Sequence, residues 1–120
     1  MKNRKKFNIL CVCLFLNAYA LSAQQTGYAC YYSEKLCGRR VARGEKLDCQ
    51  KLTAAHLKYP FGTKIRVTNL DNDKSVIVTI NDRGPFNKKD IIDLTPAAAK
   101  KIGLTQSLGR IKVKIQKVVD

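Results

Sequence analysis

The feature that most constrains this fold is a strict alternation of apolar and polar side chains in three stretches of the chain. Residues 64–68 and 75–80 alternate in this way on either side of the polar segment 69–74, which is rich in Asn and Asp. Residues 110–116 alternate again, with Ile or Val at every second position and Arg, Lys or Gln between them. Successive side chains of a β-strand point to opposite faces, so this period predicts three half-buried strands, the first two joined as a β-hairpin.

One helix is marked by its end residues. Thr95 is a good N-cap, Pro96 suits the first turn, and Gly103 stands where a helix ends. These residues predict a short helix over residues 97–102. Residues 90–94, directly before the cap, are predicted as a short strand.

The remaining segments complete a small β-rich domain. Residues 29–32 are predicted as another strand, and residues 33–51 as an irregular segment interrupted by Gly38 and Gly44. Roughly six short strands and one helix predict a single, all-β-dominated domain. Such strands are expected to close into a small barrel, because closure removes exposed sheet edges.

The first 23 residues have the three parts of a secretory signal peptide. A basic start over residues 2–6 precedes the uncharged and mainly apolar run 7–20, and small residues follow up to Ala23. A membrane anchor is the alternative, but a run of about 14 residues is shorter than the roughly 20 that span a bilayer. We therefore expect cleavage after Ala23, or alternatively after Ala20, and a folded domain over residues 24–120.

This leader also sets the expected location. The protein is predicted to be periplasmic or secreted, with no transmembrane segment after cleavage. The two cysteines inside the apolar run, Cys11 and Cys13, lack the small-residue context that lipidation requires.

The charge of the chain is strongly positive. There are 23 Lys and Arg against nine Asp and Glu, a formal net charge of +14. The part after residue 23 keeps 19 of these bases and all nine acids, a net charge of +10. An anionic polymer or an anionic lipid suits such a surface, and a solvated basic surface without a partner is the simpler alternative. Export argues against nucleic acid, so we expect no nucleic-acid binding.

Three cysteines follow the leader, namely Cys30, Cys37 and Cys49. Disulfides persist in the oxidising compartment that an exported protein enters. Three cysteines allow three single pairings and leave one thiol over, and the sequence leaves the pairing open. We expect at least one disulfide, with Cys49 as a partner because it stands just before the apolar segment that begins at Leu52. The cysteine spacing does not suit zinc, and a chain with one histidine has no multi-histidine cluster, so no metal or cofactor is expected.

A carboxylate stands where a predicted strand gives way to a turn. Asp82 lies in the segment Asn81-Asp82-Arg83-Gly84-Pro85-Phe86, directly after the strand over residues 75–80. A tight turn at a strand end holds a catalytic group still. The alternative is an Asp that accepts hydrogen bonds from its own loop.

Other polar and aromatic residues allow chemistry or packing. Glu45 is either a solvated loop charge or a second functional acid. His56 is a packed residue, a proton carrier or a hydrogen-bonding partner of a sugar. Aromatic side chains such as Tyr32 and Phe86 stack on the apolar faces of sugars, although aromatic residues fill cores more often.

Several short segments stand in a characteristic order along the chain. They are Tyr31-Tyr32, Gly38-Arg39, Gly44-Glu45, Leu52-Thr53-Ala54-Ala55-His56, Pro60-Phe61-Gly62-Thr63, Val67-Thr68-Asn69-Leu70, Asn81-Asp82-Arg83-Gly84-Pro85-Phe86 and Ile91-Ile92-Asp93-Leu94. In order and spacing this series resembles the rare lipoprotein A (RlpA-like) family over roughly residues 27–118. The resemblance implies a six-stranded double-psi β-barrel with one short helix.

The resemblance also implies an activity. Members of that family are periplasmic lytic transglycosylases, which cleave the β-1,4 bond between N-acetylmuramic acid and N-acetylglucosamine and leave 1,6-anhydro ends. The chain is therefore expected to act on the glycan strands of peptidoglycan, as a monomer and without a cofactor.

The family's functional residues match positions of this chain. Asp82 matches the catalytic Asp, Glu45 matches the second essential acid, and His56 matches the family's His. Asp93 resembles a catalytic Asp of related expansin-type and MltA-type barrels and is a reserve candidate. With His56, four further residues are expected to contact the substrate: Asn81, Arg83, Phe86 and Tyr32.

The implied mechanism needs one carboxyl group. The attacking C6 hydroxyl is tethered next to the anomeric carbon, so Asp82 would protonate the leaving oxygen and then take the proton of that hydroxyl. Glu45 would tune or orient the site, and the sequence leaves open how Arg43 and Arg83 act on it.

A non-catalytic, expansin-like module that binds peptidoglycan is the alternative, because it shares the fold, the charge and the location. Intact Asp82 and Glu45 favour the enzyme. The segment Val41-Ala42-Arg43-Gly44 favours the binding module, because the family usually has Thr-Ala-Asn/Ser-Gly there.

Overall fold

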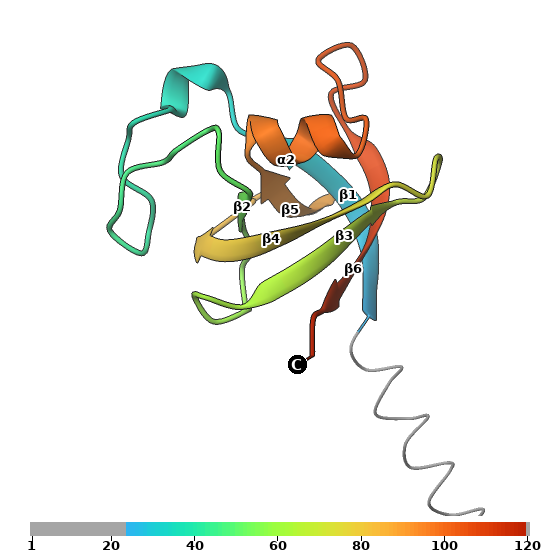
Figure 1. Ribbon diagram of the computed structural model, residues 1–120, viewed down its shortest axis with the longest axis horizontal. Helices are drawn as coiled ribbons and strands as arrows, with labels where there is room; N and C mark the ends of the chain where they lie inside the picture. Colours follow the sequence, from blue (N-terminus) through green and yellow to red (C-terminus); the bar gives the residue numbers. More distant parts are fainter. Residues whose placement is uncertain (1–23, 120) are drawn as a thin grey trace, which may run out of the picture.

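The alternating stretches form strands of one closed barrel (Figure 1). Their apolar side chains are buried inside it. The computed structural model describes residues 24–119, so the expected signal peptide over residues 1–23 lies outside them. The elements are β1 (Gln24–Tyr31), the 3₁₀ turn η1 (Glu34–Leu36), β2 (Thr53–Ala55), β3 (Lys64–Asn69), β4 (Ser75–Asp82), β5 (Asp90–Leu94), α2 (Pro96–Lys101) and β6 (Ile111–Lys117).

The strands follow the order β1-β5-β2-β4-β3-β6 around the barrel, and β6 pairs with β1 to close it. The pairs β1–β5 and β2–β4 are parallel, and the other neighbours are antiparallel. The six-stranded barrel with one short helix expected from the sequence is confirmed.

Strand β1 is longer than predicted. It begins at Gln24 rather than at Ala29, and its first residues pair with β6, where Gln24 lies opposite Gln116. The backbone hydrogen bonds to β6 hold this extension, and they need no alternation of side chains. The apolar-polar pattern therefore underestimated the strand.

The barrel interior is filled by inward-facing side chains. Those without exposed surface include Ile65, Val67, Ile80, Ile92, Val113 and Ile115. Fully burying a side chain of this size contributes about 1.5–3 kcal/mol, so these positions supply much of the stability of the fold. Helix α2 covers one end of the barrel and buries Ala98 and Ala99. No helix among residues 24–119 is long and apolar enough to cross a membrane.

Helix α2 is attached to the barrel at both ends. At its start, Thr95 Oγ1 accepts from the backbone N–H of Ala98 at 3.4 Å and donates to the Lys51 carbonyl at 2.6 Å. At its end, the side-chain amides of Asn69 and Asn72 donate to the Ile102 carbonyl at 2.7 and 3.1 Å. The N-cap at Thr95 is confirmed, and the β3–β4 turn is fastened to the helix.

The segment over residues 33–51 forms a loop beside β2 and the end of β4 (Figure 1). An isolated bridge joins Arg40 to Lys46, and a disulfide joins Cys37 to Cys49. A small apolar cluster fastens the loop to the barrel; its buried members are Tyr32, Val41, Leu47 and Ala55. The predicted disulfide with Cys49 is confirmed, and Cys30 is the free thiol among residues 24–119.

We expect the Cys37→Ser/Cys49→Ser variant to lose about 3 kcal/mol of unfolding free energy, because the bond closes a loop with a sequence separation of 12 residues. Equilibrium urea unfolding measures the loss. Cys30→Ser is the matched control, since it changes a thiol but keeps the disulfide. A double variant as stable as that control would contradict this expectation.

Candidate active site

A row of side chains crosses the outer face of four strands. Cys30 of β1 is paired with Asp93 of β5. Asp93 is paired with Ala55 of β2, which in turn is paired with Asp82 of β4. Directly paired residues point to the same face of a sheet, so the row places a carboxylate on either side of the small Ala55 side chain. A one-residue register shift just before Ala55 brings Asp82 into this row.

Three donors hold the carboxylate of Asp82. Its Oδ2 accepts a hydrogen bond from the Tyr32 hydroxyl at 2.7 Å. Its Oδ1 accepts from the backbone N–H of Ala42 at 2.8 Å and from that of Arg83 at 2.9 Å. Asp82 is half-buried, so its carboxylate is fixed in direction while the residue keeps some contact with solvent. A fixed, reachable carboxyl is what acid–base chemistry on a bound substrate needs.

The buried Tyr32 side chain orients the carboxylate of Asp82. The ring is 7% exposed and packs with Val41, Leu47 and Ala55. Burial, followed by the hydrogen bond to Asp82, raises the pKa of Tyr32 far above its ordinary value. The hydroxyl therefore keeps its proton and stays a donor.

The 33–51 loop reaches the site through its backbone. Besides the Ala42 N–H on Asp82, the N–H of Arg43 donates to the Asn81 carbonyl at 3.1 Å. On the other side, the N–H of His56 donates to the Asp82 carbonyl at 3.2 Å. The end of β4 is thus held from two directions.

Glu45 lies on the same loop as an exposed ion pair with Arg43. Arg43 Nη2 donates to Glu45 Oε2 at 2.9 Å, and its Nε contacts the other carboxylate oxygen. The hydrogen bond from Arg43 holds the pKa of Glu45 below its ordinary value. Among residues 24–119 no direct hydrogen bond joins Glu45 to Asp82.

Asn81 directly precedes Asp82 on β4 and lines a cavity with Glu45. It is 3% exposed and borders a small cavity of about 30 Å³ together with Glu45 and Thr53. Its Oδ1 has no hydrogen-bond partner within the described residues. Buried polar atoms normally have partners, so this oxygen is an acceptor left available at the site.

Asp93 and Cys30 form a second, half-buried pair at the other end of the row. The Cys30 thiol lies 3.1 Å from Asp93 Oδ1. Burial, together with the negative charges of Asp90 and Asp82, raises the pKa of Asp93. Burial and the hydrogen bond to Asp93 raise the pKa of the Cys30 thiol, which keeps its proton. In the described part of the chain no three His, Cys, Asp or Glu side chains are grouped to hold a metal ion.

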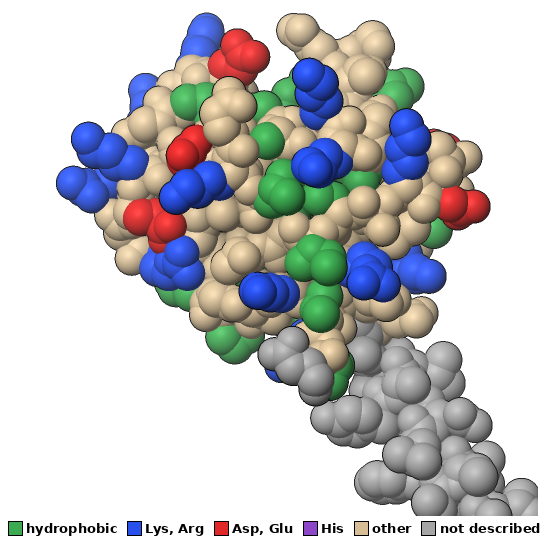
Figure 2. All heavy atoms as spheres, viewed as in Figure 1, with side chains coloured by type: hydrophobic (Ala, Val, Ile, Leu, Met, Phe, Trp, Pro, Cys, Tyr) green, Lys and Arg blue, Asp and Glu red, His purple; other side chains and the backbone are tan. Residues whose placement is uncertain are grey.

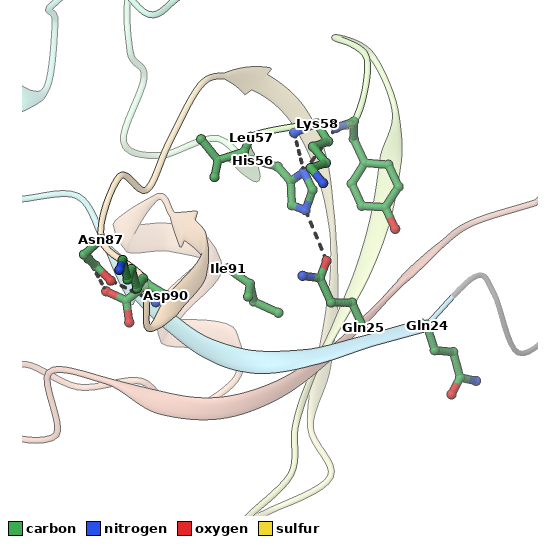
Figure 3. Close-up of a pocket in the computed structure, with 10 residues that line it drawn as sticks. Gln24, Gln25, His56, Leu57, Lys58, Asn87, Asp90 and Ile91 are labelled. Carbon is green, nitrogen blue, oxygen red and sulfur yellow. Dashed lines mark hydrogen bonds between the residues drawn. The ribbon is translucent and has the colours of Figure 1, made fainter.

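His56 is 6% exposed, and its ring organises the loop after β2. Its Nδ1 accepts from the backbone N–H groups of Lys58 and Tyr59 at 3.0 and 3.1 Å. A nitrogen that accepts twice carries no proton, so the neutral ring has its proton on Nε2, which faces Gln25 Oε1 at 3.5 Å (Figure 3). Burial and then the charge of Arg83 lower the pKa of His56.

Arg83 is engaged in the same loop. Its Nη1 donates to the carbonyls of His56 and Tyr59 at 3.0 and 2.9 Å, and its guanidinium lies 4.0 Å from the centre of the Phe61 ring. Phe86 is 83% exposed and free to contact a ligand. The structure therefore gives Arg83 a positioning task, whereas the substrate contacts expected of Arg83 and Phe86 stay predictions.

Comparisons with known proteins identify the family of this chain. Residues 24–115 match the family model described as lytic transglycolase. This chain belongs to the RlpA-like family of double-psi β-barrels.

Curated relatives of this family are similar over most of the chain. The endolytic peptidoglycan transglycosylase RlpA of Pseudomonas aeruginosa is 46% identical over 97 residues, which cover 81% of this chain and 28% of that protein. The protein of the same name from Neisseria meningitidis serogroup A is 46% identical over 95 residues, covering 79% of this chain and 39% of that protein. The chain thus spans about a third of the length of these relatives.

Solved structures share the fold at low identity. The Streptomyces papain inhibitor superposes with a TM-score of 0.64 at 22% identity, covering 80% of this chain and 94% of that one. An expansin of Clavibacter michiganensis in complex with cellohexaose gives a TM-score of 0.63 at 18% identity, covering 81% and 51%. This likeness concerns the fold alone.

The groups that donate hydrogen bonds to Asp82 were not predictable from the sequence. The hydrogen bond from the Tyr32 hydroxyl to Asp82 was not predicted, and the substrate contact expected of Tyr32 stays a prediction. The Ala42 donor is a backbone N–H, for which no side chain gives a signal. The Cys30–Asp93 contact was detectable only from the β1–β5 register, which the sequence does not specify.

We expect His56 to remain neutral, with its proton on Nε2, at and below the ordinary histidine pKa of about 6.5. Because the folded-state pKa is lowered, the unfolded chain binds the proton first as the pH falls. This contribution to stability is therefore complete above about pH 6.5 and is lost as the pH falls through the folded-state pKa. Ring-nitrogen NMR reports the tautomer, and His56→Gln, which cannot titrate, removes this part of the pH dependence. A proton on Nδ1 at neutral pH would contradict the assignment.

Proposed function

We propose that this chain is a peptidoglycan lytic transglycosylase in which Asp82 is the acid–base residue. The observation that carries the proposal is the three-donor seat of Asp82 at the end of β4. The 46% identity to proteins named endolytic peptidoglycan transglycosylase supports the reaction class. The glycan strands of peptidoglycan are the substrate, and the protein acts outside the cytoplasm as a monomer without a cofactor.

The reaction uses one carboxyl group twice. Protonated Asp82 gives its proton to the glycosidic oxygen, and the bond from that oxygen to the anomeric carbon of N-acetylmuramic acid breaks. The C6 hydroxyl oxygen of the same ring bonds to the anomeric carbon and releases its proton to Asp82. The products are a free 4-hydroxyl on N-acetylglucosamine and a 1,6-anhydro ring, and no water is consumed. Since the nucleophile is tethered to the reacting carbon, no second carboxyl has to activate it.

Neither nearby arginine makes an ion pair with Asp82. Arg43 pairs with Glu45, and Arg83 binds the carbonyls of the His56 loop. Direct guanidinium pairing would stabilise the carboxylate as an anion and oppose its protonation. Both guanidinium groups are thus kept out of direct contact with the Asp82 carboxylate.

The unusual segment over residues 41–43 does not disturb this seat. Asp82 binds the backbone N–H of Ala42, and a backbone donor is independent of the side chain that follows it. Val41 fills the apolar cluster beneath the loop, and Arg43 is occupied by Glu45. The substitution that favoured a non-catalytic module thus leaves the contacts of Asp82 intact.

An expansin-like, non-catalytic module remains the second candidate. The exposed Glu45–Arg43 pair favours it. In the free protein the carboxylate of Glu45 is paired with a cation and is not directed at a bond that would be cleaved. The basic surface suits both functions: Lys and Arg side chains are spread over the face in Figure 2, where Asp and Glu are few. Peptidoglycan carboxylates are complementary to that charge.

We expect Asp82→Asn to reduce the release of 1,6-anhydro ends by about 10²–10⁴-fold. The Asn oxygen still accepts from Ala42 and Arg83, and its amide donates to the Tyr32 hydroxyl, which turns to accept. The free energy of unfolding should change by less than about 1 kcal/mol. Mass spectrometry of digested glycan strands measures the products, and thermal unfolding is recorded on the same sample.

Asp71→Asn is the matched control, since it makes the same change on the exposed β3–β4 turn. A wild-type protein that binds glycan strands without ever producing anhydro ends would reject the enzyme and leave the binding module. Loss of activity in step with loss of folded protein would mean that Asp82 is only structural.

We expect Glu45→Gln to lower kcat/KM about tenfold, because a charged acceptor near the bound sugar is replaced by a neutral one. Arg43→Gln is the comparison, since it removes the partner and keeps the carboxylate. Steady-state kinetics on purified glycan strands should show the loss for Glu45→Gln alone. Equal losses in both variants would show that the ion pair, and not the carboxylate, is what matters.

A further inference from the structure

A pocket of about 480 Å³ opens next to His56, and the proposed reaction makes no use of it. Its walls come from the start of β1, the loop after β2 and the segment before β5. Figure 3 shows His56 and Lys58 on one side and Asn87 and Asp90 on the other, with Ile91 between them.

The pocket carries an excess of positive charge. Lys58 and Lys88 line it, both are exposed, and neither pairs with an acid among residues 24–119. The one acid of the lining, Asp90, is neutralised by Arg110, whose Nε and Nη2 lie 2.7 and 3.0 Å from its two oxygens. Asn87 donates to Asp90 as well, at 2.8 Å. The acid of the pocket is therefore already occupied, and the two lysines are not.

Burial alone would raise the pKa of Asp90, but the hydrogen bonds from Arg110 and Asn87 bring it below its ordinary value. Asp90 thus stays ionised and paired at any pH near neutrality, and it does not take up the lysine charges.

The pocket also offers a hydrogen-bond donor. Both backbone donors near His56 use its Nδ1, so Nε2 carries the proton. Its nearest partner is Gln25 Oε1 at 3.5 Å, which is longer than the 2.7–3.2 Å of a good N–H···O bond. This N–H is available to a stronger acceptor that enters the pocket.

The pocket is connected to the catalytic residue through the backbone. The N–H of His56 donates to the Asp82 carbonyl, and Arg83 ties the carbonyls of His56 and Tyr59 to the turn after β4. The loop that forms one wall of the pocket is therefore held directly against the end of β4 that carries Asp82.

We propose that this pocket is a carboxylate subsite, in which the His56 Nε2–H donates to a carboxylate of the glycan strand while Lys58 and Lys88 supply the opposing charge. The proposal rests on the proposed function, because it takes the ligand to be peptidoglycan. Two sources offer the same group: the lactyl carboxylate of muramic acid, which is free only where the stem peptide has been removed, and the carboxylates of the stem peptide itself.

Binding is measured on the secreted protein carrying Asp82→Asn, so that strands are not cleaved during the titration. The probes are peptide-free glycan strands, the same strands with methyl-esterified carboxyls, and peptide-bearing strands. Lys58→Gln/Lys88→Gln should weaken about tenfold the binding of the strands, peptide-free or peptide-bearing, that supply the bound carboxylate. The binding of esterified strands should be unaffected. Lys64→Gln/Lys112→Gln, which removes two exposed lysines from β3 and β6, is the control of equal charge.

The arms identify the source of the carboxylate. Tight, lysine-dependent binding of peptide-free strands with weak binding of peptide-bearing strands assigns the lactyl group, and the reverse order assigns the stem peptide. Equal losses in the two double variants, or esterified strands that bind as tightly as the free acids, would overturn the subsite. Since no cleavage is involved, the subsite stands if wild-type protein yields no anhydro ends, and the proposed activity stands if anhydro ends form but the binding result is negative.

Discussion

The hydrogen bonds to the Asp82 carboxylate depend on segments that lie far apart in the sequence. Tyr32 is placed by the bond from its N–H to the Leu94 carbonyl at 2.9 Å, which prolongs the parallel β1–β5 pair. Ala42 is placed by a loop that a disulfide and a small apolar cluster hold against β2. These segments are far apart in the sequence and meet only when the barrel closes, so the seat of the carboxylate is a property of the completed fold.

Positive charge surrounds the site without neutralising it. Arg43 and Arg83 both stand close to Asp82. Arg43 pairs with Glu45, whereas Arg83 binds main-chain carbonyls and lies over Phe61. A guanidinium in a bidentate pair with a carboxylate fixes that group as an acceptor. With both cations engaged elsewhere, the basic surface is complementary to an anionic polymer, while the Asp82 carboxylate keeps Tyr32 and two backbone N–H groups as its donors.

The strands and the helix were predictable because each depends on local patterns. The strands predicted from the alternation over residues 64–68, 75–80 and 110–116 and the capping Thr95 appear in the structure as expected. The disulfide partner Cys49 was also predictable from its place before a packed segment, whereas its pairing with Cys37 was not. Strand register is not a local property, and a single shift before Ala55 decides which residue of β4 enters the row with Asp93.

The candidate site was predictable to a smaller extent. The resemblance indicated Asp82, Glu45 and His56 as positions, but roles follow from partners, and most partners here are backbone groups. The His56 tautomer follows from two backbone N–H groups, and part of the seat of Asp82 follows from the N–H of Ala42. Side-chain identity carries no information about such donors, which exist at every residue except proline.

The two acids of the row on the outer face, Asp82 and Asp93, influence each other through their charges. Two ionised carboxylates on either side of Ala55 would repel each other and destabilise the sheet that carries them. Burial beside the Cys30 thiol raises the pKa of Asp93, and the charge of Asp82 raises it further. The half of the row nearer β1 therefore accepts a proton more readily than an ordinary aspartate does, and at the other end Tyr32 and two backbone N–H groups hold the carboxylate of Asp82. Asp82 is thus a firmly held carboxylate in a chain with few acids, and His56, whose N–H donates to the Asp82 carbonyl, lines the pocket that we assign to the carboxylates of the substrate.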